Sequence, residues 1–248
     1  NGTLNGEANL AATATANSID ETAVATADFD KNYGVESEGD LTVGATGSLT
    51  GTADLDLTAT AVTVGDDSSS DAATATAGNT SADNIGLALD EEATNIGANG
   101  TVVGDADADL SASATGVAAD VTADVDLDQA TAIDLSGETL TIGDAGTITA
   151  NSRVGTTASA TTIDGNGVAD IEVDEIQGLG DGDGTATVGS NATIDADASA
   201  TNTATASATD ADSSVVASID NNTVEAINLD AINAGDNLAL DADASSTQ

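Results

Sequence analysis

Residues 49–61 read Leu-Thr-Gly-Thr-Ala-Asp-Leu-Asp-Leu-Thr-Ala-Thr-Ala. Small or apolar residues occupy every second position of this stretch, and polar residues stand between them. An alternation of period two places all the small and apolar side chains on one face of a β-strand. The stretch therefore predicts a strand that buries one face.

The same alternation recurs along the whole chain, and each copy opens with a larger apolar residue. The spacings between successive openers are 45, 53, 46, 46 and 44 residues. A recurrence near 45 residues is typical of repeat architectures, in which neighbouring copies share one continuous core. The openers are Leu4, Leu49, Val102, Ile148, Ile194 and Leu238.

We therefore expect an all-β fold: a repetitive β-solenoid or stacked β-sheet in which residues 1–248 form a single domain, with a partial copy from residue 238. A β-sandwich with alanine-rich faces is the alternative. Turn elements rich in Gly, Asn and Asp precede the openers, as in residues 43–49, 96–102 and 142–148. A second alternation follows in each copy, which predicts three or four strands per copy. The chain has no proline, as a long hydrogen-bonded ladder requires.

Charge excludes several classes of protein. The chain carries 44 Asp and Glu residues against 2 Lys and Arg residues, for a formal charge of −42. Binding to nucleic acid or to an anionic membrane surface needs cationic groups, so neither is expected. No apolar stretch approaches the roughly 20 residues of a membrane span, so no membrane insertion is expected. Such a charge also occurs in disordered chains, but the maintained alternation favours an ordered fold.

The residues needed for most catalysis are missing. The chain has no His and no Cys, so no Ser or Thr has a paired base. Phe29 and Tyr33 are the only aromatic residues, which leaves little with which to line a substrate pocket. We expect no enzyme activity, no catalytic residues and no organic cofactor. Lys31 and Arg153 are expected to be ion-pair partners, and the two aromatic residues to fill a local gap.

Hydroxyl side chains recur at the same two offsets from the opener in five copies. Stacked copies would align them into ladders, which stabilise exposed sheet faces. The array is also similar to the flat face of β-solenoid ice-binding proteins, a resemblance that implies an ice-binding surface. The pairs are Thr13/Thr15, Thr58/Thr60, Ser111/Ser113, Thr157/Ser159 and Thr203/Thr205.

Acidic residues alternate in the same way in several strands. Carboxylates two positions apart on a strand point the same way, so stacked copies would form repelling rows that divalent cations relieve. A solvated acidic face is one interpretation and diffuse Ca²⁺ or mineral binding is the other. The runs are Asp54/Asp56, Asp105/Asp107/Asp109, Asp124/Asp126/Asp128, Asp170/Glu172/Asp174, Asp195/Asp197 and Asp241/Asp243.

Two short segments suggest more specific calcium sites. Residues 164–170 resemble part of the Asp-rich calcium loops of thrombospondin-type and dockerin-like repeats, which implies Asp164, Asn166 and Asp170 as metal ligands. Thr162 stands where those loops carry their first acidic ligand. Residues 178–184 resemble the glycine-aspartate turns of RTX-type repeats, which implies Asp181 and Asp183 as ligands. The alternative is that both segments are flexible acidic turns.

The chain as a whole resembles acidic, low-complexity β-repeat surface and filament proteins of bacteria and archaea. This resemblance implies a structural subunit of an extracellular filament, adhesin stalk or surface layer. We expect it to assemble with itself, head to tail, by pairing residues 232–248 of one molecule with residues 1–16 of the next. A surface or matrix polysaccharide is a further expected partner. The alternative function is a Ca²⁺-, mineral- or ice-binding module.

Overall fold

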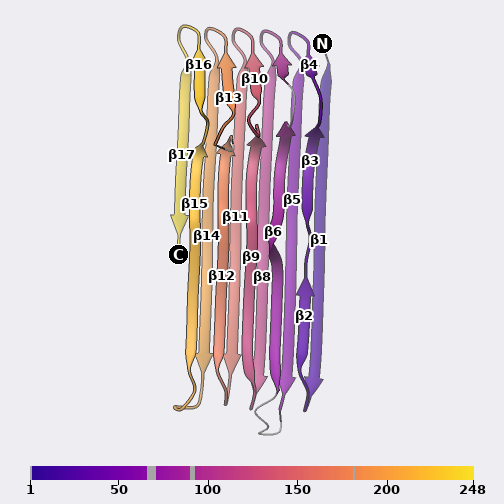
Figure 1. The fold of residues 1–248 in the computed structure, drawn as a ribbon, viewed down its shortest axis with the longest axis vertical. Coiled ribbons are helices and arrows are strands. Elements are labelled where there is room, and N and C mark those ends of the chain that lie inside the picture. The colour runs from indigo at the N-terminus through magenta and orange to yellow at the C-terminus, as the bar shows by residue number, and fades with distance from the viewer. Residues whose placement is uncertain (1, 66–70, 90–92, 181) are drawn as a thin grey trace.

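The computed structural model describes residues 2–65, 71–89, 93–180 and 182–248. These residues form seventeen strands and no helix, and the recorded strand pairs are all parallel. Figure 1 shows long strands lying side by side, with the chain advancing by one coil at a time across the stack. The expected all-β solenoid of stacked sheets is confirmed, because a sandwich of hairpin-connected strands would pair antiparallel.

Each coil contributes one strand position to each of three sheets. Sheet A consists of β1 (Thr3–Ile19), β5 (Ser48–Val64), β8 (Thr101–Val117), β11 (Thr147–Thr162), β14 (Thr193–Ala208) and β17 (Ala239–Thr247). Sheet B consists of β2 (Ala23–Ala27) and β3 (Lys31–Ser37) in the first coil, then β6 (Ala72–Leu89), β9 (Asp120–Asp134), β12 (Gly167–Leu179) and β15 (Val215–Ile227). Sheet C consists of β4 (Leu41–Val43), β7 (Thr94–Ile96), β10 (Thr139–Ile142), β13 (Thr185–Val188) and β16 (Ala231–Ala234).

The three sheets make a flat, two-layered body. Strands of sheet A contact strands of sheet B across the interior. Sheet C continues beyond sheet B toward the end of the molecule that carries the tight turns (Figure 1). Apolar residues of sheets A and C share one core cluster, so sheet C covers that end of sheet A.

The openers of the first five copies stand in one row of sheet A. Leu4 pairs with Leu49, and the row continues in register to Ile194. The last member of the row is Leu240, and the expected opener Leu238 is wrong by two residues. Leu238 instead follows Asn237, whose φ of 61° places it in the stacked turn. Because Leu238 and Leu240 are both apolar and keep the same alternation, the sequence alone does not distinguish which of them stands in the row.

The longer second copy is explained by two local insertions. Residues 65–71 connect β5 to β6, whereas only residues 118 and 119 connect β8 to β9. Strand β6 also contains a bulge, because the register shifts between Asn79 and Asp83 opposite β9. Both insertions lie outside sheet A, so its rows stay aligned.

The turns between sheets C and A stack on one another. In three of them the fourth residue donates its N–H to the carbonyl of the first, as Gly47 does to Gly44 at 2.9 Å. The third residue of each turn has a positive φ of 54° to 61° without being glycine: Thr46, Asn99, Ala145, Asn191 and Asn237. Each turn also bonds to the next, as when Asn99 N–H donates to Asp144 O at 2.8 Å.

The core is built mainly from alanine, and the two layers lie very close together. An added Cβ at Gly51 would stand 2.2 Å from the carbonyl oxygen of Gly86 across the interior, and one at Gly104 would stand 2.1 Å from that of Ala132. Sheets A and B therefore meet through their backbones in this row. A layer spacing this small explains how few large side chains can fill the interior.

Some polar groups are buried inside, and their hydrogen bonds join the layers. Asn84 is fully buried on β6 and donates to the carbonyl of Asp107 on β8 at 2.9 Å. Asn32 donates to Asn84 Oδ1 at 2.8 Å and to the Asp54 carbonyl at 3.0 Å. These asparagines satisfy one another and the backbone of sheet A, so they fix the position of sheet B against it. Of the two aromatic residues expected to fill a gap, Phe29 is buried in the core and Tyr33 is partly buried.

Candidate functional site

The outer face of sheet A carries the hydroxyl ladders in the predicted register. Thr13 pairs with Thr58, Thr58 with Ser111, Ser111 with Thr157, and Thr157 with Thr203. The second row, two positions further along each strand, aligns in the same way. In β5, β8 and β11 these residues alternate with fully buried alanines, and in β1 and β14 with partly buried ones, so their side chains stand on the solvent side of the sheet.

The hydroxyl rows belong to a larger surface without any ionisable group, which we call the neutral face. It extends to the ends of the strands, where apolar residues form its last row. Three members of that row are exposed, at 76% for Ile19, 43% for Val64 and 51% for Ile163. The neutral face comprises Thr13, Thr15, Asn17, Ile19, Thr58, Thr60, Val62, Val64, Ser111, Ser113, Thr115, Val117, Thr157, Ser159, Thr161, Ile163, Thr203, Thr205 and Ser207.

Sequence reasoning found the two hydroxyl rows of this surface and missed its apolar row. The signal was present, because Ile19, Val64 and Val117 keep the same parity as the hydroxyls before them. An apolar residue on the polar parity contradicts a simple inside–outside pattern. The first four copies place this apolar residue at the last position of the strand or just beyond it, where the alternation ends.

Carboxylates form rows over the other half of sheet A and over sheet B. On sheet A, Asp54 pairs with Asp107 and Asp56 with Asp109. On sheet B, Asp126 pairs with Glu172, which in turn pairs with Asp220. Neighbouring strands are about 4.8 Å apart, so these rows hold like charges closer than a Debye length at physiological ionic strength.

The rows perturb the ionisation of their members. Burial and then the charges of Asp124, Glu172, Asp170 and Asp174 raise the pKa of Asp126 to about 6. Burial, followed by the neighbouring charge of Asp170, also raises the pKa of Asp124. On sheet A, burial and then the charges of nearby carboxylates raise the pKa values of Asp109 and Asp197. The folded state therefore takes up protons more readily than separate carboxylates would.

The residues proposed as calcium ligands in 164–170 engage neighbouring coils. Asn166 donates its side-chain amide to Asp120 Oδ1 at 3.1 Å and accepts from the Ser214 N–H at 3.1 Å. Asp170 lies on β12, and its carboxylate accepts a hydrogen bond from the Ser218 hydroxyl. Asp164 lies in the connection before β12, where its carbonyl accepts from the Ala119 N–H at 2.9 Å. The loop thus stacks between coils.

The second proposed calcium segment lies between β12 and β13. Asp183 is exposed there, and Asp181 lies outside the described residues. Within the described ranges, no group of three or more carboxylates could hold a metal ion.

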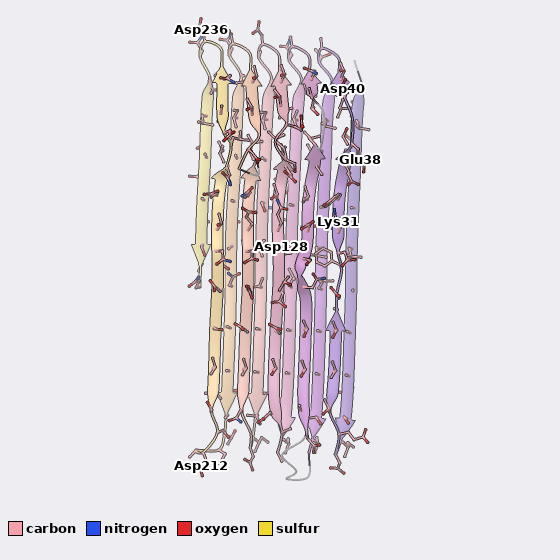
Figure 2. All side chains as sticks on the ribbon, in the orientation of Figure 1. Lys31, Glu38, Asp40, Asp128, Asp212 and Asp236 are labelled. Carbon is pink, nitrogen blue, oxygen red and sulfur yellow. The ribbon has the colours of Figure 1, made fainter. Side chains whose placement is uncertain are left out.

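The two cationic residues lie on opposite layers. Arg153 on β11 forms an ion pair with Asp107, at 3.7 Å between Nη1 and Oδ1. Lys31 on β3 lies with its Nζ 5.0 Å from the ring centre of Tyr33. The Tyr33 hydroxyl in turn donates to Asp83 at 3.2 Å. Both cations thus lie near acidic groups on exposed strand faces; Figure 2 labels Lys31 among the side chains of the stack.

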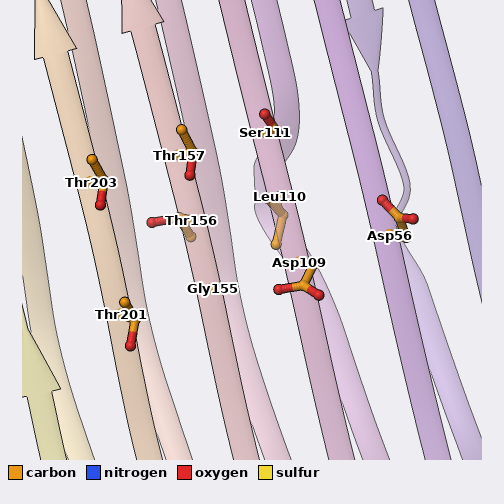
Figure 3. Close-up of a pocket in the computed structure, with 9 residues that line it drawn as sticks. All are labelled: Asp56, Asp109, Leu110, Ser111, Gly155, Thr156, Thr157, Thr201 and Thr203. Atoms are coloured by element: carbon orange, nitrogen blue, oxygen red, sulfur yellow. The ribbon is translucent and has the colours of Figure 1, made fainter.

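A shallow depression of about 250 Å³ lies at the border between the acidic rows and the neutral face. It opens over Gly155, which lacks a side chain in an outward row that contains Asp56 and Asp109 in the preceding coils. An added Cβ at Gly155 would stand 2.5 Å from Asp109 Oδ1, so that carboxylate leans over the gap. Figure 3 shows Thr201 and Thr203 on the strand on the far side of Gly155 from Asp109, and Thr157 on the strand of Gly155 itself. The polar groups of its lining are carboxylates and hydroxyls, Leu110 adds apolar surface, and no aromatic residue takes part.

Comparison with known protein families, curated proteins and solved structures finds no match to this chain. The described residues also contain no helix that could cross a bilayer.

Proposed function

We propose that this chain is a structural subunit of an extracellular filament, adhesin stalk or surface layer, and that copies join end to end through the edges of their sheets. The observation that carries the proposal is the hydrogen-bonding pattern of the two open edges of sheet A. Open strand edges readily pair with a further strand.

The two edges complement one another. Ala239 donates its N–H to the carbonyl of Ala192, the residue just before β14. Parallel strands direct alternate residues to opposite neighbours, so Leu240, Ala242 and Ala244 direct their backbone groups away from the stack. At the other end Gly2 accepts from the Ser48 N–H, so Thr3 and the alternate residues after it face outward on β1. The outward backbone groups of β17 thus lie on Leu240 and every second residue after it, and those of β1 on Thr3 and every second residue after it. Internal pairs of sheet A use the same combination.

A joint of this kind has two weak points. The described strands fill six positions in sheet A and five in sheet B, so pairing of the sheet A edges leaves one strand position of sheet B open at the joint. The joint would also align Asp243 with Glu7 of the next copy, because each stands three residues after the residue of the opener's row. We expect assembly to be promoted by salt, which screens this repulsion.

Electron microscopy of the purified chain in low and high salt tests the proposal. We expect uniform filaments in which each coil adds about 4.8 Å, the spacing of neighbouring strands, along the filament axis. Ala242→Pro removes one outward N–H from β17 without breaking an internal bond and should shorten or abolish the filaments. The matched control Ala242→Ser keeps the N–H and should leave them intact. Dispersed particles in every condition would overturn the proposal.

Cation or mineral binding along the carboxylate rows is the second candidate function, and the aligned rows on sheets A and B favour it. Oxygen-rich, negatively charged surfaces suit Ca²⁺. Calorimetric titration with Ca²⁺ at 0.15 M NaCl tests it, with Mg²⁺ as the comparison. Heat of binding that disappears when Asp126 and Glu172 are replaced by Asn and Gln would support this function. An ice-binding module predicts instead thermal hysteresis from the dispersed chain.

A further inference from the structure

The neutral face is unusual for this molecule because of what it lacks. The chain has 44 acidic residues, yet none of the nineteen residues of the neutral face is ionisable. The half of the same sheet face above it carries Asp54, Asp56, Asp107 and Asp109, and the outer face of sheet B carries rows of carboxylates. Charge is therefore confined to part of the surface rather than spread over all of it.

We infer that the neutral face is a self-association surface, on which a second copy of this chain packs face to face. The first argument is electrostatic. Two copies that each carry a formal charge of −42 repel wherever carboxylates meet. A contact through this face brings together hydroxyls, amides and aliphatic groups alone, with the acidic rows at its margin.

The chemistry of the face is also self-complementary. A Ser or Thr hydroxyl both donates and accepts hydrogen bonds, so a surface of hydroxyls can satisfy an identical surface across a two-fold axis. The exposed side chains of Ile19, Val64 and Ile163, together with the partly buried Val117 of the same row, add apolar area that the solvated chain leaves in water. Flat sheet faces of this kind pack about 10 Å apart with their side chains interdigitated.

The size of the face predicts a weak contact. Five strands at about 4.8 Å spacing and four outward rows at about 6.7 Å give a patch of roughly 20 Å by 20 Å between its outer residues, and about 600 Å² with their margins. Stable protein pairs bury about 800 Å² on each partner. A single pair is therefore expected to exchange, whereas many such contacts along two aligned rods would reinforce one another.

Sedimentation equilibrium of the Ala242→Pro chain tests the inference, since this variant blocks end-to-end pairing and leaves the neutral face unchanged. We expect a monomer–dimer equilibrium that strengthens between 0.1 and 1 M NaCl, because added salt screens the repulsion at the margin. In this background, Thr58→Asp with Thr157→Asp should weaken dimerisation by at least about tenfold, since like charges would face each other across the contact.

The matched control places the same charges on the same two strands, outside the neutral face. Thr50→Asp with Thr149→Asp also alters β5 and β11 on the outer side of sheet A. This pair should leave the dimer constant within about twofold, and circular dichroism should show equal folding of both variants.

Several results would overturn the inference. The inference is wrong if the Ala242→Pro chain stays monomeric at several hundred micromolar protein in 1 M NaCl. It is also wrong if the two double variants weaken dimerisation equally. A monomer with thermal hysteresis that Thr58→Asp and Thr157→Asp remove would assign the face to ice instead. None of these results bears on the end-to-end proposal, which the parent chain with an intact Ala242 tests separately.

Discussion

Single residues set the backbone geometry of the stacked turns. The third turn position requires a positive φ, and L-residues other than Gly, Asn and Asp seldom adopt it. Three turns use asparagine there, and Asn237 donates to Asn191 at 3.3 Å across neighbouring coils. Ala145 adopts a φ of 54° with no side chain that could join such a ladder.

Replacement of Ala145 is therefore expected to stabilise the fold. Ala145→Asn introduces the residue type that the other coils use, and should raise the free energy of unfolding by about 0.5 to 1 kcal/mol. Ala98→Asn, at the second position of the preceding turn, is the control and should have little effect. Urea denaturation of the two variants checks this; equal changes in both would contradict the explanation.

Ionisation of a single carboxylate is the second effect at this scale. The pKa of Asp126 is about 6 in the folded chain and about 3.9 when unfolded. The folded state binds the proton more tightly, so this group adds stability fully below the unfolded pKa, and the added stability is lost as the pH rises through 6. The urea midpoint is therefore expected to increase between pH 7 and pH 4.

Asp126→Asn isolates this contribution. The variant should be more stable than the parent chain at pH 7 and should lose part of the increase on acidification. The control Asp212→Asn removes one charge from the exposed turn between β14 and β15. Figure 2 labels this residue at the end of the strands opposite the tight turns. The control should change the pH response far less. A pH response of unchanged size in Asp126→Asn would contradict the assignment.

At the scale of the strands, the small distance between sheets A and B limits the size of the side chains that the interior can hold. Alternation in the sequence predicts each strand of sheet A and the residues it buries, because a period of two allows only one assignment of faces. It does not predict the backbone contact at Gly51 and Gly104, since glycine in a strand has several possible causes. The strands of sheet C, of three or four residues each, are too short to show a period.

Gly51→Ala tests the close approach of the layers. Its Cβ would stand 2.2 Å from the Gly86 carbonyl and 2.3 Å from Leu87 Cδ2, so the layers must separate. We expect a loss of about 1 to 3 kcal/mol in the free energy of unfolding, as for other overpacked cores. Gly39→Ala, with no atom within 4 Å of the added Cβ, is the control.

At the scale of the whole molecule, the uneven distribution of charge could be predicted only in part. The hydroxyl rows and acidic runs are visible in the sequence, and their register follows once copies stack. The hydrogen-bond partners of Asn166 and Asp170 could not be predicted from the sequence. These partners, Asp120, Ser214 and Ser218, lie 46 to 48 residues away in neighbouring coils. A seven-residue resemblance carries no information about such contacts.

The parallel register of sheet A also has a mechanical consequence. Its strands lie across the axis of the stack, so tension applied along that axis loads the hydrogen bonds of one coil edge at a time. The last three openers are 46 residues apart, and an extended chain spans about 3.4 Å per residue. Each coil that peels away would thus release roughly 150 Å of chain, and a pulled rod would lengthen in equal steps while the remaining coils stay folded.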